Sequence, residues 1–282
     1  MTAEKGQIGF VDYNLENFHA KVYLNLLRNE LKDQGFAVAG CTGMREKESR
    51  VWAEENGVPY FSDVEALNEV VDYYMVLAPS NPEVHLELCQ KVFPFGKTTY
   101  VDKTFAPDLR TAKSIFALAD RYSVAMQTTS ALRYTNVQDY VGGIGSEKVK
   151  HMVTWGGGRS FGEYAIHPLE LAISCMGAGV RRVMRRGTGN HSQLLLDFSR
   201  SRTAVVNVYA KSKTPYAASV TTSEETEYLP VERSRIFLNT AAAVLGLFRS
   251  GRPDIDRKES LIIRRVLDVA GQQQALEGFV KV

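Results

Sequence analysis

The first 130 residues alternate short apolar runs with amphipathic stretches, an order that few folds accommodate. The apolar runs have the length and residue types of buried strands and cover residues 7–11, 36–41, 72–77, 98–102 and 124–127. The stretches between them have roughly helical spacing and cover residues 18–32, 46–56, 83–93 and 108–122. Alternating strands and helices build a parallel sheet covered on both faces, with right-handed crossovers. We therefore predict a doubly wound parallel sheet of the Rossmann type, an α/β dinucleotide-binding domain, for residues 1–130.

The pattern changes after about Arg133, where polar and apolar residues alternate as in antiparallel strands. Such strands are predicted at residues 149–155, 192–198, 203–210 and 217–222. Helices are expected at residues 168–176, 234–248 and 258–279. We predict that residues 131–282 form an α+β substrate-binding and oligomerisation domain with a mostly antiparallel sheet, whose last helix can pack back on the first domain. Helices on one face of a sheet leave the other face to cover, so we expect a homodimer or homotetramer through this sheet.

Length and composition fit two ordinary globular domains. The 282 residues exceed the usual size of one core, and a net charge of +2 gives no reason to expect nucleic acid or a membrane as partner. The cysteines Cys41, Cys89 and Cys175 form no CxxC pair, which disfavours disulfides and a metal site. The N-terminal MTAEKGQIGF lacks the features of a signal peptide, and no apolar stretch approaches ~20 residues. We expect a cytoplasmic protein.

Ligands of doubly wound sheets bind at the carboxyl ends of the strands, which here selects the loops 12–17, 42–45, 78–81 and 102–105. A dinucleotide fold carries G-x-G-x-x-G in the first loop, so that backbone amides can approach the diphosphate. This chain has GFVDYNLEN over residues 9–17, in which only the first glycine, Gly9, remains. Asp12 and Glu16 would place carboxylates near a diphosphate. The first loop therefore predicts a weak, altered or absent phosphate site.

The second loop bears on the choice between NAD and NADP. An acidic residue usually follows the second strand and binds the adenosine ribose, but this chain has CTGMR over residues 41–45, with no acid before Glu46. Thr42, Gly43 and Arg45 could accept a 2′-phosphate, which favours NADP, or Arg45 could simply begin the next helix in solvent.

Several segments, in this order and at this spacing, resemble the glucose–fructose oxidoreductase/inositol dehydrogenase family. VLAPSNPEVH over residues 76–85 is similar to a loop of that family, and GKTTYVDKT over residues 96–104 is similar to its G-K-x-V-x-x-E-K-P segment. EYAIHPLE over residues 163–170 resembles its helix-entry motif, in which an acid stands four residues before a histidine. Asp102-Lys103-Thr104 departs from Glu-Lys-Pro, so the proline of the family's loop is missing.

The resemblance implies NAD(P)-dependent oxidation or reduction of a secondary hydroxyl on a sugar, polyol or glycoside. On the matching positions, His167 is the base that accepts the hydroxyl proton, and Lys103 stabilises developing alkoxide charge. Glu163 could orient His167 if both lie on one helical turn. Pro168 allows an alternative, because a residue before proline is disfavoured in a helix and His167 could then stand at the helix cap. A buried structural histidine is the competing interpretation.

The resemblance also indicates the residues around the ligands. Cofactor contacts are expected from Gly9, Val11, Asp12, Tyr13, Thr42, Gly43, Arg45, Ala78, Pro79, Asn81, His85, Asp102 and Lys103. For His85 a packing or capping role is more typical, and His19 is typical of an exposed residue at a helix start. Substrate contacts are expected from Arg133, Trp155 and Tyr164. Arg133 could instead tie the two domains together, and Trp155 could be a core residue.

Two other functions remain open. A tightly held cofactor could support transient oxidation in a lyase or isomerase. The altered glycine loop also favours a non-catalytic family member that binds a sugar or a nucleotide.

Overall fold

The computed structural model describes residues 6–282, which form two compact units. The first unit contains the chain up to Thr129 together with Phe237–Ile255, and the second contains Ser130–Ile236 and Asp256–Val282. Residues 1–5 lie outside the described residues. They are part of the N-terminal stretch that lacks the features of a signal peptide.

The first unit is built on a five-stranded parallel sheet with the order β2-β1-β3-β4-β5. The strands are β1 (Gly6–Asp12), β2 (Phe36–Gly43), β3 (Tyr73–Val76), β4 (Thr99–Asp102) and β5 (Met126–Thr129). The order reverses between β1 and β3, because the chain runs from β1 to β2 on one side and continues at β3 on the other. Such a reversal separates two neighbouring loops at the carboxyl edge and is where ligands of this architecture bind.

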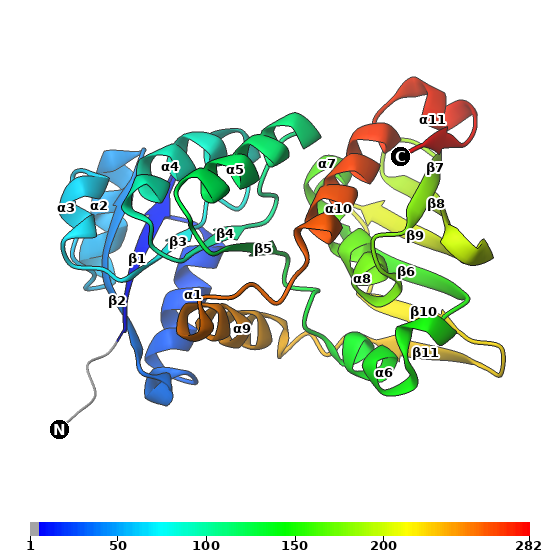
Figure 1. Cartoon of the computed structure of the whole chain (residues 1–282), viewed down its shortest axis with the longest axis horizontal. Coiled ribbons are helices and arrows are strands. Elements are labelled where there is room, and N and C mark those ends of the chain that lie inside the picture. Colours follow the sequence, from blue (N-terminus) through cyan, green and yellow to red (C-terminus); the bar gives the residue numbers. More distant parts are fainter. Residues whose placement is uncertain (1–5) are drawn as a thin grey trace. The chain divides into compact units, whose positions relative to one another are not determined.

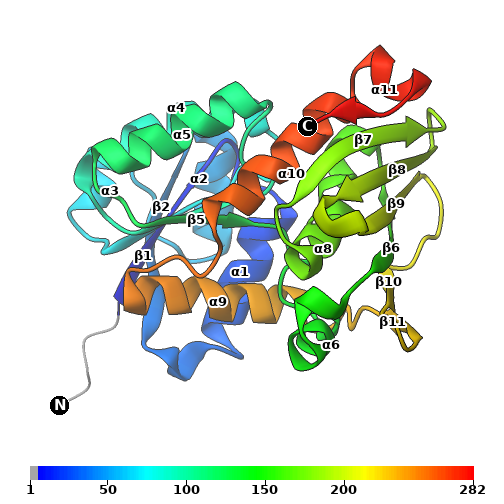
Figure 2. The ribbon, with the colours of Figure 1, turned by 45° about the vertical axis from the view of Figure 1, so that its right-hand side comes forward.

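Helices cover both faces of this sheet (Figures 1 and 2). They are α1 (Phe18–Arg28), α2 (Glu46–Glu55), α3 (Val64–Asn68), α4 (His85–Val92), α5 (Leu109–Arg121) and α9 (Ile236–Ser250). The two figures show α1 and α9 on one face and α4 and α5 on the other. Leu245 and Phe248 of α9 share one buried cluster with Phe10, Tyr23 and Tyr100. A helix from late in the chain therefore belongs to the first unit. This helix is α9, which carries the apolar residues that fill the core, whereas the last helical segment was the one expected to pack there.

The second unit contains a seven-stranded sheet with the order β11-β10-β6-β9-β8-β7-β12. Its strands are β6 (His151–Gly158), β7 (Val180–Arg186), β8 (His191–Phe198), β9 (Thr203–Ala210), β10 (Ala217–Thr221), β11 (Thr226–Pro230) and β12 (Val280–Lys281). All neighbours are antiparallel except β6 and β9. Its helices are α6 (Asn136–Ile144), α7 (Phe161–Tyr164), α8 (Ile166–Met176), α10 (Arg257–Ala270) and α11 (Gln273–Glu277). The predicted fold class, a Rossmann sheet followed by an α+β part with a mostly antiparallel sheet, is confirmed.

The two faces of the second sheet differ in what covers them. Side chains that point toward α8 are buried, and Thr154 Oγ1 on this face donates to the backbone oxygen of Pro168 at 2.8 Å. On the opposite face, β6 presents Val153 and Trp155, which remain partly exposed. The register pairs Val153 with Val205 of β9, and Val205 with Leu195 of β8. This second face therefore carries an apolar row across three strands, with the polar residues Gln193, Asn207 and Asp197 beside it.

Other features of the described residues limit the chemistry. Cys41, Cys89 and Cys175 are buried free thiols. Within residues 6–282, no three His, Cys, Asp or Glu side chains gather in a way that could hold a metal ion. No helix in that range is long and apolar enough to span a bilayer.

Candidate active site

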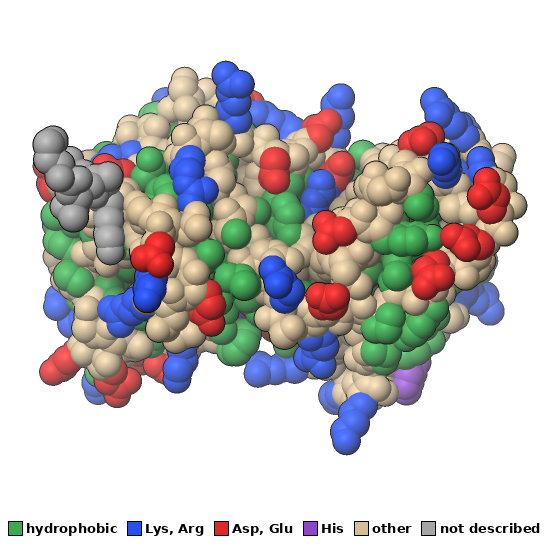
Figure 3. All heavy atoms as spheres, turned by 90° about the horizontal axis from the view of Figure 1, so that it is seen from below, with side chains coloured by type: hydrophobic (Ala, Val, Ile, Leu, Met, Phe, Trp, Pro, Cys, Tyr) green, Lys and Arg blue, Asp and Glu red, His purple; other side chains and the backbone are tan. Residues whose placement is uncertain are grey.

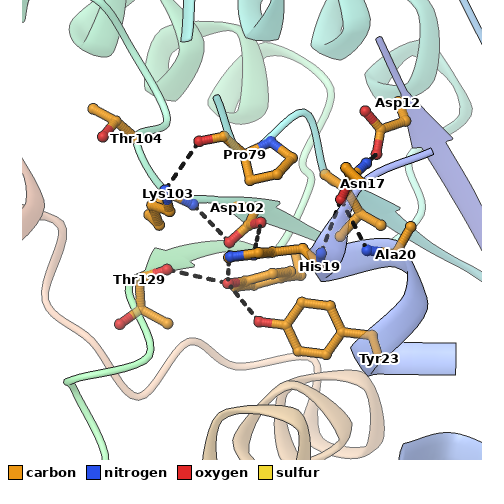
Figure 4. A network of polar contacts seen from close by, with 12 residues as sticks. Asp12, Asn17, His19, Ala20, Tyr23, Pro79, Asp102, Lys103, Thr104 and Thr129 are labelled. Carbon is orange, nitrogen blue, oxygen red and sulfur yellow. Dashed lines mark hydrogen bonds and ion pairs between the residues drawn. The ribbon is translucent and has the colours of Figure 1, made fainter. Parts of the chain in front are cut away.

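Asp102 ends β4 at the carboxyl edge of the first sheet and is the centre of a buried polar network (Figure 4). Its Oδ2 lies 2.5 Å from His19 Nδ1, which belongs to the first turn of α1. Its Oδ1 accepts hydrogen bonds from the backbone N–H of Lys103 at 2.8 Å and from the hydroxyl of Tyr100 at 3.1 Å. The carboxylate therefore fixes the backbone from which the Lys103 side chain projects.

Two phenols extend this network into the core. The Tyr100 hydroxyl lies 3.1 Å from the backbone oxygen of Thr129 and 3.4 Å from the Tyr23 hydroxyl. Burial, together with the charge of Asp102, raises the pKa of Tyr23 and of Tyr100 well above the ordinary value. Both hydroxyls therefore keep their protons near neutral pH, and Tyr100 remains a hydrogen-bond donor.

Lys103 and His85 join the loops that follow β3 and β4. Lys103 is 4% exposed, and its Nζ donates to the backbone oxygen of Pro79 at 3.1 Å. His85 is buried, with Nε2 at 2.6 Å from the oxygen of Leu77 and Nδ1 at 3.1 Å from the oxygen of Thr104. Burial lowers the pKa of His85, although the two carbonyl groups oppose that shift. These contacts give His85 a structural role, as the sequence favoured.

Gly9 does not belong to the turn after β1. It lies within that strand, which continues to Asp12, and a Cβ there would meet the side chains of Leu67, Val71 and Tyr74 at 3.2 to 3.3 Å. Gly9 is therefore a packing residue, contrary to the expectation that it is the remaining glycine of a phosphate-binding turn. The turn itself, residues 13–17, contains no glycine.

The amide groups of this turn donate to the chain's own side chains. The N–H of Asn14 donates to Asp12 Oδ1, and that of Glu16 donates to Asn14 Oδ1. At the start of α1, Asn17 Oδ1 accepts from the N–H groups of His19 and Ala20. In a glycine-rich turn these donors would face a diphosphate. As folded here, the turn does not offer them, so the diphosphate of a dinucleotide does not fit without rearrangement.

A cavity of about 320 Å³ lies beside the turn, between the carboxyl ends of β1 and β2 and the helices α3 and α4. Val11, Thr42 and Gly43, which are among the expected cofactor residues, line it. Its acidic residues are Asp12, Glu46, Asp63 and Glu65. Its one cation among the lining residues, Lys91, lies 2.9 Å from Glu87. Carboxylates in such a cavity can accept hydrogen bonds from the hydroxyls of a ribose.

Three expected cofactor residues lie at the margin of this arrangement. Arg45 is exposed, does not line the cavity, and donates from Nη2 to Glu48 Oε1 at 3.0 Å. The backbone oxygen of Tyr13 accepts from the N–H of Arg45 at 2.8 Å. Asn81 Nδ2 donates to Glu83 Oε1 at 3.0 Å. The cavity thus gives no support to the interpretation of Arg45 as a 2′-phosphate ligand.

His167 lies inside a helix of the second unit rather than at its cap. Helical backbone continues from α7 through Ala165 (φ −61°, ψ −26°) into α8, so Glu163 stands one turn before His167. The imidazole is 7% exposed, and its ring centre lies 5.7 Å from that of Tyr164 and 6.0 Å from that of Tyr216. Burial raises the pKa of Tyr216, whose hydroxyl donates to the oxygen of Gly157 at 3.1 Å. An imidazole is a side chain suited to accept or donate a proton in acid–base catalysis.

The structure does not bring Trp155 to His167. Strand β6 alternates, so Gly156 faces Pro168 of α8 while Trp155 points to the other face, where its ring meets that of Tyr228 at 5.9 Å. The expectation that Trp155 faces the substrate is therefore corrected. Arg133 forms an ion pair with Glu259 of α10 and so ties two segments of the second unit to each other.

Sequence reasoning missed the residues that support Asp102. His19 is buried rather than exposed, and Tyr100 and Asn17 complete the network and the turn. The available signal was Asn17 directly before a helix, which is typical of an N-cap. The pairing of His19 with Asp102 spans 83 residues and had no local signal.

Residues 8–130 match the model of an oxidoreductase family with an NAD-binding Rossmann fold. These residues of the first unit are therefore similar to that family, in agreement with the resemblance found from the sequence. No curated protein matches the sequence.

Several solved structures have the same fold along the whole chain. A structure from Thermotoga maritima described as a probable dehydrogenase has a TM-score of 0.83 at 16% identity, with 98% of each chain covered. The myo-inositol 2-dehydrogenase of Lactobacillus plantarum has a TM-score of 0.81 at 13% identity, with 99% of each chain covered. A 3-ketoreductase from Actinomadura kijaniata, bound to TDP-benzene and NADP, has a TM-score of 0.73 at 15% identity, with 94% of this chain and 96% of that chain covered. Identities this low establish the shared fold.

Proposed function

We propose that the protein is an NAD-dependent oxidoreductase that interconverts a secondary hydroxyl and a ketone on a sugar or polyol. The observation that carries this proposal is the buried Asp102–Lys103 pair at the carboxyl end of β4, in a family whose Rossmann domain binds NAD. An ammonium group held at this edge is suited to stabilise an alkoxide. The dehydrogenase and ketoreductase names of the structural neighbours support the same reaction class.

Each protein group has a role that follows from its own surroundings. When bound, the nicotinamide supplies hydride acceptance and donation. Lys103 donates a hydrogen bond to the substrate oxygen, after exchanging its contact with Pro79. His167 takes the hydroxyl proton, and Glu163, one turn earlier, orients it. Tyr164 lies beside His167 and is assigned to substrate binding.

We infer that NAD is the preferred cofactor. The acidic lining residues Glu46, Asp63 and Glu65 support this proposal, because carboxylates can accept hydrogen bonds from ribose hydroxyls, and Arg45 is not among the lining residues. This differs from the tendency toward NADP expected from the sequence, which rested on the missing acid directly after the second strand and on Thr42, Gly43 and Arg45. The NADP in the Actinomadura ketoreductase belongs to that protein's site.

We also propose that two copies associate through the second face of the second unit's sheet. Val153, Trp155, Val205 and Leu195 lie side by side there, and Tyr228 of β11 is 53% exposed. Figure 3 shows hydrophobic side chains gathered at the surface at the right of the view. An exposed group of neighbouring apolar side chains commonly marks a protein–protein contact.

A second candidate, nucleotide binding without turnover, is favoured by the occupied amides of the β1–α1 turn. Following NADH absorbance with a panel of inositols and sugars separates the two. The wild type is expected to reduce NAD⁺ with at least one substrate. Absence of turnover with every substrate, despite NAD⁺ binding, would support the second candidate.

Matched variants test the assigned residues. Lys103→Met should lower kcat by about 100-fold or more, whereas Lys97→Met should not, because Lys97 Nζ binds the oxygens of Asn68 and Val71 before β4 begins. His167→Ala should lower kcat similarly, with the half-exposed His151→Ala as control. Equal activity of Lys103→Met and Lys97→Met would refute the catalytic role of Lys103.

A further inference from the structure

We propose that Asp12 is a built-in competitor of the cofactor's diphosphate and thereby sets the affinity of this protein for dinucleotides. The inference rests on the proposed function, because it assumes that a dinucleotide binds at this edge of the sheet. It assigns a role in specificity to a residue that a glycine-rich turn does not contain.

The position of Asp12 carries the first part of the argument. It ends β1, directly beside the point where the strand order reverses. Its carboxylate accepts from the N–H of Asn14 at 3.1 Å and from Asn17 Nδ2 at 2.8 Å, and these two contacts hold the β1–α1 turn. The backbone N–H of Ala78, in the β3–α4 loop, also acts on this carboxylate and lowers its pKa. One side chain therefore bridges the two loops between which a dinucleotide would pass.

The bond to Ala78 also fixes an uncommon backbone. Ala78 has φ 45°, in the left-handed region that residues with a Cβ seldom adopt. A hydrogen bond to a buried carboxylate can maintain such a conformation. Release of Asp12 would therefore free both the Ala78 N–H and the loop that carries Pro79, the partner of Lys103.

Electrostatics carries the second part. Asp12 is 1% exposed, so its charge is poorly screened by water. A diphosphate brings negative charge and requires donors from the same amides that Asp12 and Asn17 occupy. The two anions cannot share these donors, so cofactor entry requires that Asp12 turns away or takes a proton. A protonated Asp12 can donate its hydroxyl to a phosphate oxygen.

The surroundings make protonation accessible near neutral pH. Burial raises the pKa of Asp12 to about 7, with hydrogen bonds from Asn17, Asn14 and Ala78 acting against the shift and the charge of Asp102 adding to it. Besides Asp12, the ionisable residues that line the adjoining cavity are Glu46, Tyr60, Asp63, Glu65 and Lys91. The β1–α1 turn itself adds Tyr13 and Glu16. The carboxylates among these groups, Glu16, Glu46, Asp63 and Glu65, favour the protonated form of Asp12, whereas Lys91 opposes it.

The expected pH dependence follows from the population of that form. If only neutral Asp12 admits the diphosphate, about 0.9 of the molecules are competent at pH 6 and about 0.1 at pH 8, so NAD⁺ affinity falls about ninefold between them. The diphosphate of NAD⁺ keeps its charge over this range. Adenosine, which lacks phosphate, should bind equally at both pH values.

Isothermal titration with NAD⁺ and with adenosine at pH 6 and pH 8 tests this. Asp12→Asn should bind NAD⁺ about tenfold tighter than the wild type at pH 8 and should lose the pH dependence. Asp12→Gly, which removes the bridge altogether, should do the same. Asp33→Asn makes the same charge change at an exposed residue of the first unit and should behave as wild type. Adenosine affinity and thermal melting report whether each variant keeps the fold.

The outcomes separate the two proposals. If the wild type binds NAD⁺ and the Asp12 variants bind it equally well at pH 8, the role of Asp12 is refuted while the oxidoreductase proposal stands. If neither the wild type nor either Asp12 variant binds NAD⁺ at any pH, while adenosine or melting shows a folded protein, both proposals fail.

Discussion

Replacing Tyr100 by Phe tests the network that holds Asp102 and Lys103. The substitution removes one hydroxyl from a fully buried side chain and leaves its volume almost unchanged. That hydroxyl lies 3.1 Å from the Asp102 carboxylate and 3.1 Å from the oxygen of Thr129. A hydrogen bond to a charged group contributes about 1.5–3 kcal/mol to stability. We therefore expect the free energy of unfolding of the first unit to fall by about 1.5–3 kcal/mol.

Tyr23→Phe is the matched control. It is the same chemical change in an equally buried side chain, but the Tyr23 hydroxyl has only the 3.4 Å contact with the Tyr100 hydroxyl among its hydrogen bonds on the described residues. A long bond between neutral groups contributes about 0.5 kcal/mol. Because the pKa of both phenols is raised, the two effects should stay constant between pH 6 and pH 9.

The assay can report the first unit alone. The chain has two tryptophans, and Trp52 is buried in the first unit, so urea unfolding in a Trp155→Phe background follows that unit by Trp52 fluorescence. Turnover should also fall in Tyr100→Phe, since Asp102 holds the backbone of Lys103. Equal losses of stability in Tyr100→Phe and Tyr23→Phe, or no loss in the former, would refute the network as described.

Three further variants test other parts of the account. Arg45→Ala should change the affinities for NAD⁺ and NADP⁺ by the same small factor, within about twofold, because the arginine forms an exposed ion pair with Glu48. A selective loss of NADP⁺ binding would instead support Arg45 as a ligand of the 2′-phosphate. Gly156→Ala should destabilise by about 1–3 kcal/mol and lower turnover, because the new Cβ would lie 2.8 Å from Pro168 Cδ, next to His167. Gly142→Ala, with open space around it, should do neither. Equal melting temperatures of the Gly156→Ala and Gly142→Ala variants would contradict the close packing of β6 on α8. Trp155→Glu should shift the protein in gel filtration toward its monomer mass of 31.4 kDa, and an unchanged elution volume would exclude this face as the interface.

The sequence predicted the parallel sheet well because its first three strands consist largely of apolar residues, which short-range patterns record. It could not place α9, whose apolar residues indicate burial but do not tell which core they join. Gly9 was assigned to the turn after β1 because the ends of strands are the least certain part of a prediction from sequence. In the structure, β1 continues to Asp12. Trp155 was misassigned because the face of a strand follows from its register with neighbours, which local sequence does not contain.

The candidate site was predicted unevenly for the same reason. Motifs led to the prediction of Lys103, His167 and the carboxyl-edge loops as candidates. The contacts that determine their behaviour join residues far apart in the chain, as His19 does with Asp102 and Asp12 with Ala78. The unfavourable carboxylate at the first turn was visible in the sequence, but its bridging of two loops was not.

A crystal structure of the protein soaked with NAD⁺ below pH 7 tests the central claim most directly. We expect the adenosine in the cavity lined by Val11 and Thr42, Asp12 released from Ala78, and the nicotinamide near Lys103. Density for NAD⁺ elsewhere on the protein, or an unchanged Asp12 bridge with an empty cavity at saturating NAD⁺, would contradict the assignment of this sheet edge as a dinucleotide-dependent redox site.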